Sequence, residues 1–343
     1  MPEVNDSLYN VAKAEIERLT KVYLNLVEET HNFSKVTTQS LSSKEAITIL
    51  LAGIGSLSDP EKTAVEEAVN EWERRIAVPF EIETSITAEV YLKLREVTSA
   101  YYDQLLSTTE GFAKFEPEFI QAFPHYLPLL QHIGGIFSKS KLKELVGSVS
   151  DSKISPKAAA RLASELSKRV DAGTVEKASI LARMSGTLEG MVRDLVGKIL
   201  LESVVASAFE VAGVQFQREK DYDKLSGVVY DFRADFVVPN AQTPRVFIEV
   251  RKSSSRHASL YAKDKMFSAI NWKGNNKDLL GVLVIDGNWT TTTLNVMARV
   301  FDYVLPIRAS TKVAEIVSAY VNGDESKLKW LIDFRVVKNT PKQ

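Results

Sequence analysis

The chain has 343 residues, 45% of them hydrophobic and 25% charged, and a formal net charge of −1. This is typical of about two globular domains, and no apolar stretch approaches the roughly 20 residues of a membrane span, so we expect a cytoplasmic protein without membrane contact. Because the sequence contains no cysteine, disulfides, thiol nucleophiles and thiolate zinc sites are excluded. The four histidines are dispersed, so a catalytic metal would be held mainly by oxygen, which favours Mg²⁺.

The first 180 residues show the periodicity of amphipathic helices. Helical runs are predicted at 11–26, 87–106, 117–132, 139–147 and 156–169. The run Ser42-Ser43-Lys44-Glu45 has the form of a capping box, and Asp59-Pro60 is typical of a helix start. We therefore expect a largely helical domain over residues 1–180.

From residue 181 the pattern changes to short strands alternating with helices. A long helix over 187–212 is expected to end at Gly213, since glycine readily adopts the left-handed conformation of a helix cap. Strands are predicted at 214–217, 228–238, 245–250, 279–285 and 301–307, with helices at 256–271, between the last two strands, and from a cap at Ser310 to a point before Gly323. This order predicts an α/β (α+β) core with a mixed sheet over 181–343.

Charge is distributed unevenly between the two halves. Residues 1–180 contain 20 Lys and Arg against 26 Asp and Glu, whereas residues 181–343 contain 23 against 18. Within 245–277 eight basic residues accompany only two acids, Glu249 and Asp264. A locally basic surface of this kind suits phosphate binding, and a solvated charged helix face is the alternative explanation.

Two acidic residues are predicted to face each other across a β-hairpin. A fold-back centred on Gln242, in a polar turn, places Asp235 opposite Glu249 on adjacent strands. Like charges so placed are costly unless a cation lies between them. Since side chains alternate along a strand, Arg251 emerges on the same face as Glu249 and Lys252 on the other. These groups suit metal-assisted phosphodiester hydrolysis, with Mg²⁺ held by the two carboxylates.

The spacing D-x13-E-x-R, across a hairpin that follows a helix and precedes a helix and a strand, resembles the PD-(D/E)XK nuclease superfamily and, within it, the type II restriction endonucleases. The stretch 185–194 resembles a Gly-containing segment of several of these enzymes, and Glu202 matches an acid on their core helix. The resemblance covers about residues 185–307. It implies a restriction-endonuclease-like catalytic core in 181–343, Mg²⁺ as cofactor, double-stranded DNA as substrate and a companion methyltransferase.

The chain departs from the family pattern at the third catalytic position, where lysine is usual and this sequence has Arg251. Arginine keeps the charge but does not release a proton at working pH, so it is a poor general base. Lys252, or Lys263 or Lys265 on the next helix, are alternative cations, and loss of activity in this chain is a further alternative.

Other candidate residues have both a functional and a structural interpretation. Glu202 falls on an apolar helix stripe, where an acid needs a partner, so a catalytic role and a salt bridge in the core both explain it. Candidate DNA contacts, with ordinary solvation as the alternative, are Arg256, His257, Lys263 and Lys265.

We therefore expect a Mg²⁺-dependent, site-specific endonuclease of the restriction type. The alternatives are another nuclease of the superfamily, acting in repair or nicking, and a catalytically inactive DNA-binding protein. Because one core holds one metal site and a double-strand break needs two cleavages, a homodimer with twofold symmetry is expected. The helical first half would then supply dimerisation and a DNA clamp, or would simply support the core.

Overall fold

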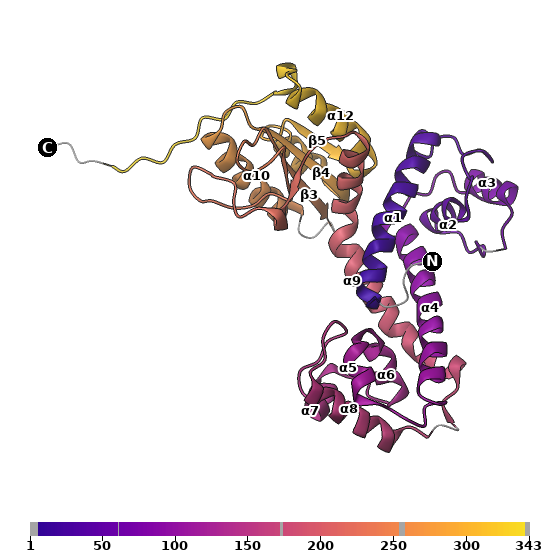
Figure 1. Cartoon of the computed structure of the whole chain (residues 1–343). Coiled ribbons are helices and arrows are strands. Elements are labelled where there is room, and N and C mark those ends of the chain that lie inside the picture. Colours follow the sequence, from indigo (N-terminus) through magenta and orange to yellow (C-terminus); the bar gives the residue numbers. More distant parts are fainter. Residues whose placement is uncertain (1–5, 61, 172–173, 254–257, 340–343) are drawn as a thin grey trace. The chain divides into compact units, whose positions relative to one another are not determined.

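The structure is a computed structural model that describes residues 6–60, 62–171, 174–253 and 258–339. Within these residues the protein is a mostly helical, mixed α/β structure with twelve α-helices and one five-stranded sheet (Figure 1). The chain divides into two compact units: a helical unit, Met1–Leu19 with Val36–Lys198, and a sheet unit, Thr20–Lys35 with Ile199–Gln343. No helix in the described part of the chain is both long enough and apolar enough to span a bilayer.

The division between the units falls inside two long helices. Helix α1 (Leu8–Glu29) changes unit after Leu19, and α9 (Lys177–Val211) changes unit after Lys198. The helix expected at 187–212 therefore starts ten residues earlier, and the expected domain boundary after residue 180 lies within a continuous helix. A helix interior carries no turn chemistry, so the sequence offers no local marker for such a division.

The helical unit also contains α2 (Lys44–Gly53), α3 (Val65–Arg74), α4 (Ile82–Thr108), α5 (Pro117–Ala122), α6 (Leu127–Ile133), α7 (Lys139–Val146) and α8 (Pro156–Arg169). A serine cap is present on α2, but one residue later than the predicted capping box of Ser42 and Glu45: the Ser43 hydroxyl accepts a hydrogen bond from the amide of Ala46 at 3.1 Å. The helix start predicted at Asp59 is wrong: the Asp59 carbonyl instead accepts hydrogen bonds from Thr63, and α3 begins at Val65. The run at 117–132 is broken at Pro124, which lacks the amide that a continuous helix requires.

The sheet unit contains β1 (Gln217–Arg218), β2 (Phe236–Val238), β3 (Val246–Ser253), β4 (Leu280–Gly287) and β5 (Tyr303–Pro306), in the order β1-β2-β3-β4-β5. The pairs β1–β2 and β2–β3 are antiparallel, whereas β3–β4 and β4–β5 are parallel. The predicted mixed sheet is therefore confirmed. The strand expected at 228–238 is shortened to its last three residues, because residues 228–235 form a loop with one isolated bridge, Leu225 to Phe232.

Helices α10 (Ala258–Asn275), α11 (Thr291–Met297) and α12 (Ser310–Val321) complete the sheet unit. Figure 1 shows β3, β4 and β5 side by side with α10 and α12 next to them. Phe247 of β3 packs edge-on against Trp272 of α10, with ring centroids 5.0 Å apart, and also meets Phe301. A side chain at Gly281 on β4 would place its Cβ 2.6 Å from the Phe247 ring. The tight packing of this aromatic core sets the position of α10 against the sheet.

A candidate active site on the sheet

The antiparallel pairing of β2 and β3 brings the two predicted carboxylates together. The ladder pairs Val238 with Val246 and Phe236 with Ile248, so the next position along places Asp235 opposite Glu249. The predicted register is therefore confirmed. Asp235 Oδ2 accepts a hydrogen bond of 2.7 Å from the amide of Val250, which turns this carboxylate across the strand pair toward β3.

Glu249 is completely buried, yet only one of its oxygens is hydrogen-bonded by a described residue. Its Oε2 accepts from the ammonium of Lys265 on α10, while Oε1 is buried and unpartnered within the described residues. Burial raises the pKa of Glu249 well above its ordinary value, the negative charge of Asp235 raises it further, and Lys265 opposes both effects. The pair therefore requires a proton or a cation.

Lys265 faces the sheet because of its place on α10. It falls on the buried series Ala262, Lys265, Ala269 and Trp272, whose steps of three and four residues trace one face of a helix. Its side chain is only 8% exposed. Direct contact of Lys265 with DNA is therefore not compatible with its position, whereas a role as the cation of the carboxylate pair is. A lysine on an apolar stripe was the signal in the sequence for this placement.

The two candidate cations on β3, Arg251 and Lys252, have different charged neighbours. Arg251 is half-buried. Burial raises the pKa of Glu202, and the positive charge of Arg251 partly opposes this effect, so Arg251 lies near the acidic residues of the site. Lys252 pairs in register with Asp286 of β4, and its Nζ lies 3.9 Å from Asp286 Oδ2. Lys252 is thus drawn to Asp286, and the role of Arg251 or Lys265 in the site is favoured over that of Lys252.

Glu202 of α9 belongs to the same acidic region. Seven residues further along this helix, Phe209 packs against Phe236 of β2, the residue that follows Asp235. Burial raises the pKa of Glu202 to about 7, with Asp235 as the next largest cause. No group of three or more His, Asp or Glu side chains in the described ranges is arranged to hold a metal ion. Glu202 is therefore an acid near the carboxylate pair, and Asp235 and Glu249 are the candidate metal ligands.

We expect the proton on Glu202 to make stability depend on pH. The folded protein holds this proton up to about pH 7, whereas the unfolded chain releases it near pH 4.5, so the contribution is favourable at low pH and is lost as pH rises through that interval. Glu202→Gln should reduce the loss of unfolding free energy between pH 5 and 8 by about 1–2 kcal/mol, after allowance for solvent exposure. Urea denaturation in metal-free buffer measures this, and equal pH slopes in the two proteins would contradict it.

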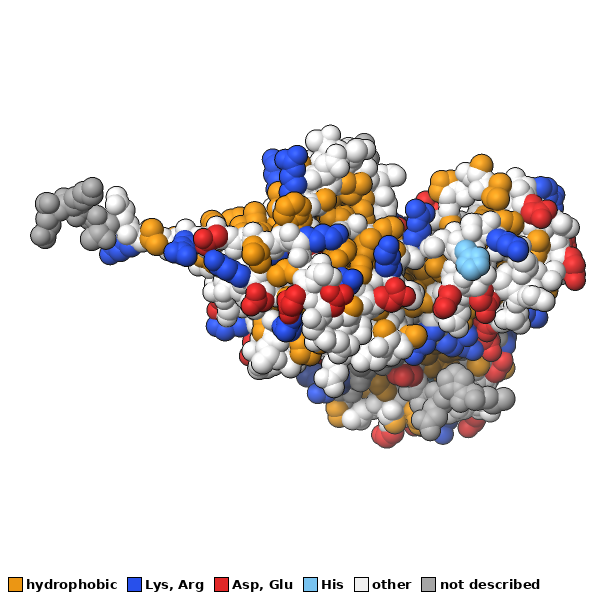
Figure 2. All heavy atoms as spheres, turned by 90° about the horizontal axis from the view of Figure 1, so that it is seen from above, with side chains coloured by type: hydrophobic (Ala, Val, Ile, Leu, Met, Phe, Trp, Pro, Cys, Tyr) orange, Lys and Arg blue, Asp and Glu red, His pale blue; other side chains and the backbone are white. Residues whose placement is uncertain are grey.

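Of the other three candidates for DNA contact, the structure describes only one. Lys263 is exposed on α10, whereas Arg256 and His257 lie outside the described residues. Of the eight basic residues in 245–277, five form ion pairs within the described structure: Arg245, Lys252, Lys265, Lys273 and Lys277. On the face drawn in Figure 2, basic and acidic side chains are interspersed. The basic stretch of the sequence is thus largely neutralised by acids from other elements.

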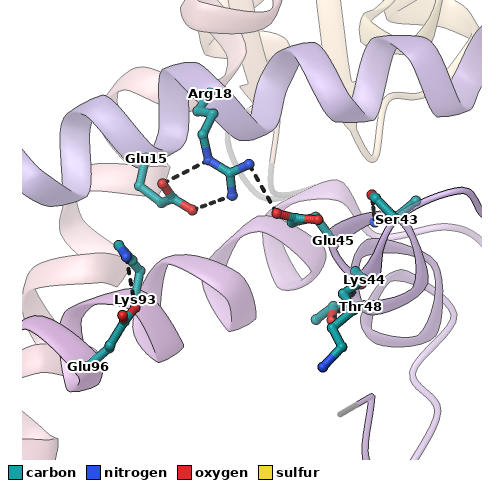
Figure 3. A network of polar contacts seen from close by, with 9 residues as sticks. Glu15, Arg18, Ser43, Lys44, Glu45, Thr48, Lys93 and Glu96 are labelled. Carbon is teal, nitrogen blue, oxygen red and sulfur yellow. Dashed lines mark hydrogen bonds and ion pairs between the residues drawn. The ribbon is translucent and has the colours of Figure 1, made fainter. Parts of the chain in front are cut away.

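The helical unit has a groove of its own, lined by residues of α1, α2 and α4 and by Leu181 and Leu188 of α9. Arg18 donates to both oxygens of Glu15, at 2.7 and 3.0 Å, and to Glu45 at 3.3 Å, and Figure 3 shows it between these two carboxylates. Lys93 pairs with Glu96 on α4 at 2.7 Å. Because Arg18 links residues of α1 and α2 and its charge is matched by its neighbours, we assign it a structural role.

The sequence did not reveal one residue beside the site, Tyr222. Its buried hydroxyl bonds to both main-chain polar groups of Ala234, the residue before Asp235. No periodicity or motif in the sequence singles it out, because its partner is main chain and brought near only by the loop at 222–235.

Comparisons of the chain with protein-family models, with curated protein sequences and with solved protein structures found no match. The functional inference therefore depends on the residues of the site and their geometry.

Proposed function

We propose that the protein is a Mg²⁺-dependent DNA endonuclease with its active site at Asp235 and Glu249. The observation that supports this proposal is the opposition of two carboxylates, Asp235 just before β2 and Glu249 on β3, with a buried lysine hydrogen-bonded to Glu249. The surrounding order also supports it, because helix α9, a hairpin, helix α10 and the parallel strand β4 follow one another as the resemblance to PD-(D/E)XK nucleases implies.

The donor set fits a hard divalent cation. Asp235 and Glu249 offer carboxylate oxygens, and Glu249 Oε1 is a buried acceptor left without a hydrogen-bond donor among the described residues. Mg²⁺ is commonly bound by one or two carboxylates, with water and phosphate oxygens completing its shell. Once bound there, the ion would polarise a phosphate oxygen and lower the pKa of an attacking water.

The chain's own residues have distinct tasks in this proposal. The amide of Val250 orients Asp235 through Oδ2, and Lys265 holds Glu249 in one rotamer. Lys265 also supplies positive charge to the carboxylate pair from its buried position, without contact to the DNA. Arg251, half-buried on the same strand as Glu249, adds a second, permanently charged group.

We expect Lys265 to be the cation on which activity depends most. Lys265→Met should lower the cleavage rate by about 10²–10³-fold, because it removes the buried positive charge that is paired with Glu249 in the site. Lys312→Met is the control, since Lys312 is exposed on α12 of the same unit and has no part in the proposed site. Single-turnover cleavage of labelled DNA measures both, with circular dichroism to establish folding. Arg251→Ala should be intermediate and Lys252→Ala mildest; a fully active Lys265→Met would contradict this order.

The function itself is tested by incubating the protein with supercoiled plasmid, with and without Mg²⁺. Discrete fragments that require Mg²⁺ would support site-specific cleavage of the restriction type. Nicking or a smear would favour a repair or nicking nuclease, and DNA binding without cleavage would favour an inactive binding protein. Since the site holds one carboxylate pair per chain, we further propose that double-strand cleavage requires a homodimer, which light scattering with and without DNA tests.

A further inference from the structure

Asp235 lies just outside the strand that precedes the site. Strand β2 begins at Phe236, so the regular ladder does not hold the main chain of Asp235 or of Ala234 before it. A metal-binding carboxylate must nevertheless be held in place, because small displacements of ligands weaken metal sites. Other hydrogen bonds to the main chain of Ala234 and Asp235 must therefore hold the Asp235 carboxylate in position.

Tyr222 provides two of these hydrogen bonds. Its hydroxyl donates to the carbonyl of Ala234 at 2.7 Å and accepts from the amide of the same residue at 2.6 Å. The side chain is 6% exposed and packs in the core of the sheet unit. A buried amide and a buried carbonyl that lack hydrogen-bond partners cost folding free energy. Because a hydroxyl can both donate and accept, the one side chain of Tyr222 satisfies both main-chain groups of Ala234. The amide of Glu219 donates to the carbonyl of Asp235 at 3.0 Å and completes the support from the other side.

We infer that Tyr222 is a positioning residue for the metal site, acting on Asp235 through the main chain of Ala234. This inference depends on the proposed function, because it assigns Asp235 to a divalent cation. Tyr222 would not contact the cation; it sets the main-chain position from which the Asp235 carboxylate reaches it. Loss of its hydroxyl should therefore raise the Kd of the metal, an effect that loss of another buried tyrosine hydroxyl in the same unit should not have.

The test compares Tyr222→Phe with Tyr320→Phe in the full chain. Tyr320 is the matched control, because it is also buried in the sheet unit and its hydroxyl also donates to a main-chain carbonyl, that of Asp278, at 2.6 Å. Binding of Mn²⁺ alone is measured by calorimetry, and thermal unfolding is measured in parallel. We expect Tyr222→Phe to raise the Kd for Mn²⁺ by about 10–100-fold, as loss of outer-shell support does in metal sites. Tyr320→Phe should lower the melting temperature without changing the Kd.

A second pair of variants covers the case in which Tyr222→Phe fails to fold. Glu219 is half-exposed and begins a 3-10 helix, a position where proline is tolerated. Glu219→Pro removes the amide that supports Asp235, whereas Glu219→Ala retains it. The proline variant should weaken Mn²⁺ binding and the alanine variant should not.

The outcomes separate the inference from the proposed function. If wild-type protein binds Mn²⁺, Asp235→Asn abolishes binding and Tyr222→Phe binds normally, the positioning role is overturned while the metal site stands. If Tyr320→Phe weakens binding as much as Tyr222→Phe does, the effect is general destabilisation and the inference is again overturned. If wild-type protein does not bind Mn²⁺, both the metal site and the role of Tyr222 are overturned.

Discussion

Asp235→Asn and Glu249→Gln should each lower Mg²⁺-dependent DNA cleavage by roughly 10²–10⁴-fold. Each change keeps the shape of the side chain and removes a negative charge that the proposed function requires for the cation. Asp235→Asn is the clearer test of the two, because Asp235 is only half-buried and its substitution disturbs the core less. Glu249 is fully buried against Lys265. Initial cleavage rates over a Mg²⁺ titration, with DNA binding measured separately, give the result.

Asp231→Asn is the matched control for the first of these variants. Asp231 lies four residues before Asp235 in the same loop, is exposed, and pairs with Lys224 at 2.6 Å. This substitution should leave the cleavage rate within about twofold of wild type, since exposed ion pairs contribute little. Unchanged activity in Asp235→Asn would remove Asp235 from the site, and equal losses in the two asparagine variants would indicate an effect on the loop as a whole.

Asp302→Ala should lower the free energy of unfolding by about 3–5 kcal/mol, the cost of leaving a buried charge without its partner. Asp302 Oδ2 accepts from Lys273 Nζ at 2.5 Å and from the amide of Gly281 at 2.7 Å, and both side chains of the ion pair are fully buried. Its Oδ1 accepts from the amides of Lys329 and Trp330, each at 2.8 Å. One carboxylate thus joins α10, β4 and the C-terminal segment to β5.

Lys273→Met is the informative comparison for Asp302. It removes the same ion pair, but the carboxylate keeps three amide donors, so the loss of stability should be smaller than in Asp302→Ala. Urea denaturation of the full chain measures both variants. Asp231→Ala, which breaks an exposed pair, should cost no more than about 1 kcal/mol. A cost for Asp302→Ala in that same range would show that the buried network does not stabilise the sheet unit.

The sequence by itself determined the parts of the protein in which local pattern and local energy agree. Strand β4, helix α12 and the opposition of Asp235 to Glu249 follow from apolar runs, helical periodicity and a turn, each of which acts within a few residues. The cap expected at Ser310 is wrong, because the N-cap of α12 is Ala309 and the Ser310 hydroxyl donates to the carbonyl of Ile307. The hairpin register could be predicted because the polar turn between the two strands is short, and its centre at Gln242 sets which residues are paired. The interpretation as a nuclease depends on the same two residues and stays a proposal.

Only the tertiary structure decided which charges meet. Lys265 and Lys263 are close in sequence, but helical rotation buries the first against Glu249 and leaves the second in solvent. The basic stretch 245–277 is matched by acids from distant elements, such as Asp302 and Glu325, and no local pattern records those pairings. Tyr222 reaches Ala234 through a loop and bonds to main chain, which has no sequence signature. The physical reason is common to all three: these interactions join groups whose proximity exists only after the chain has folded.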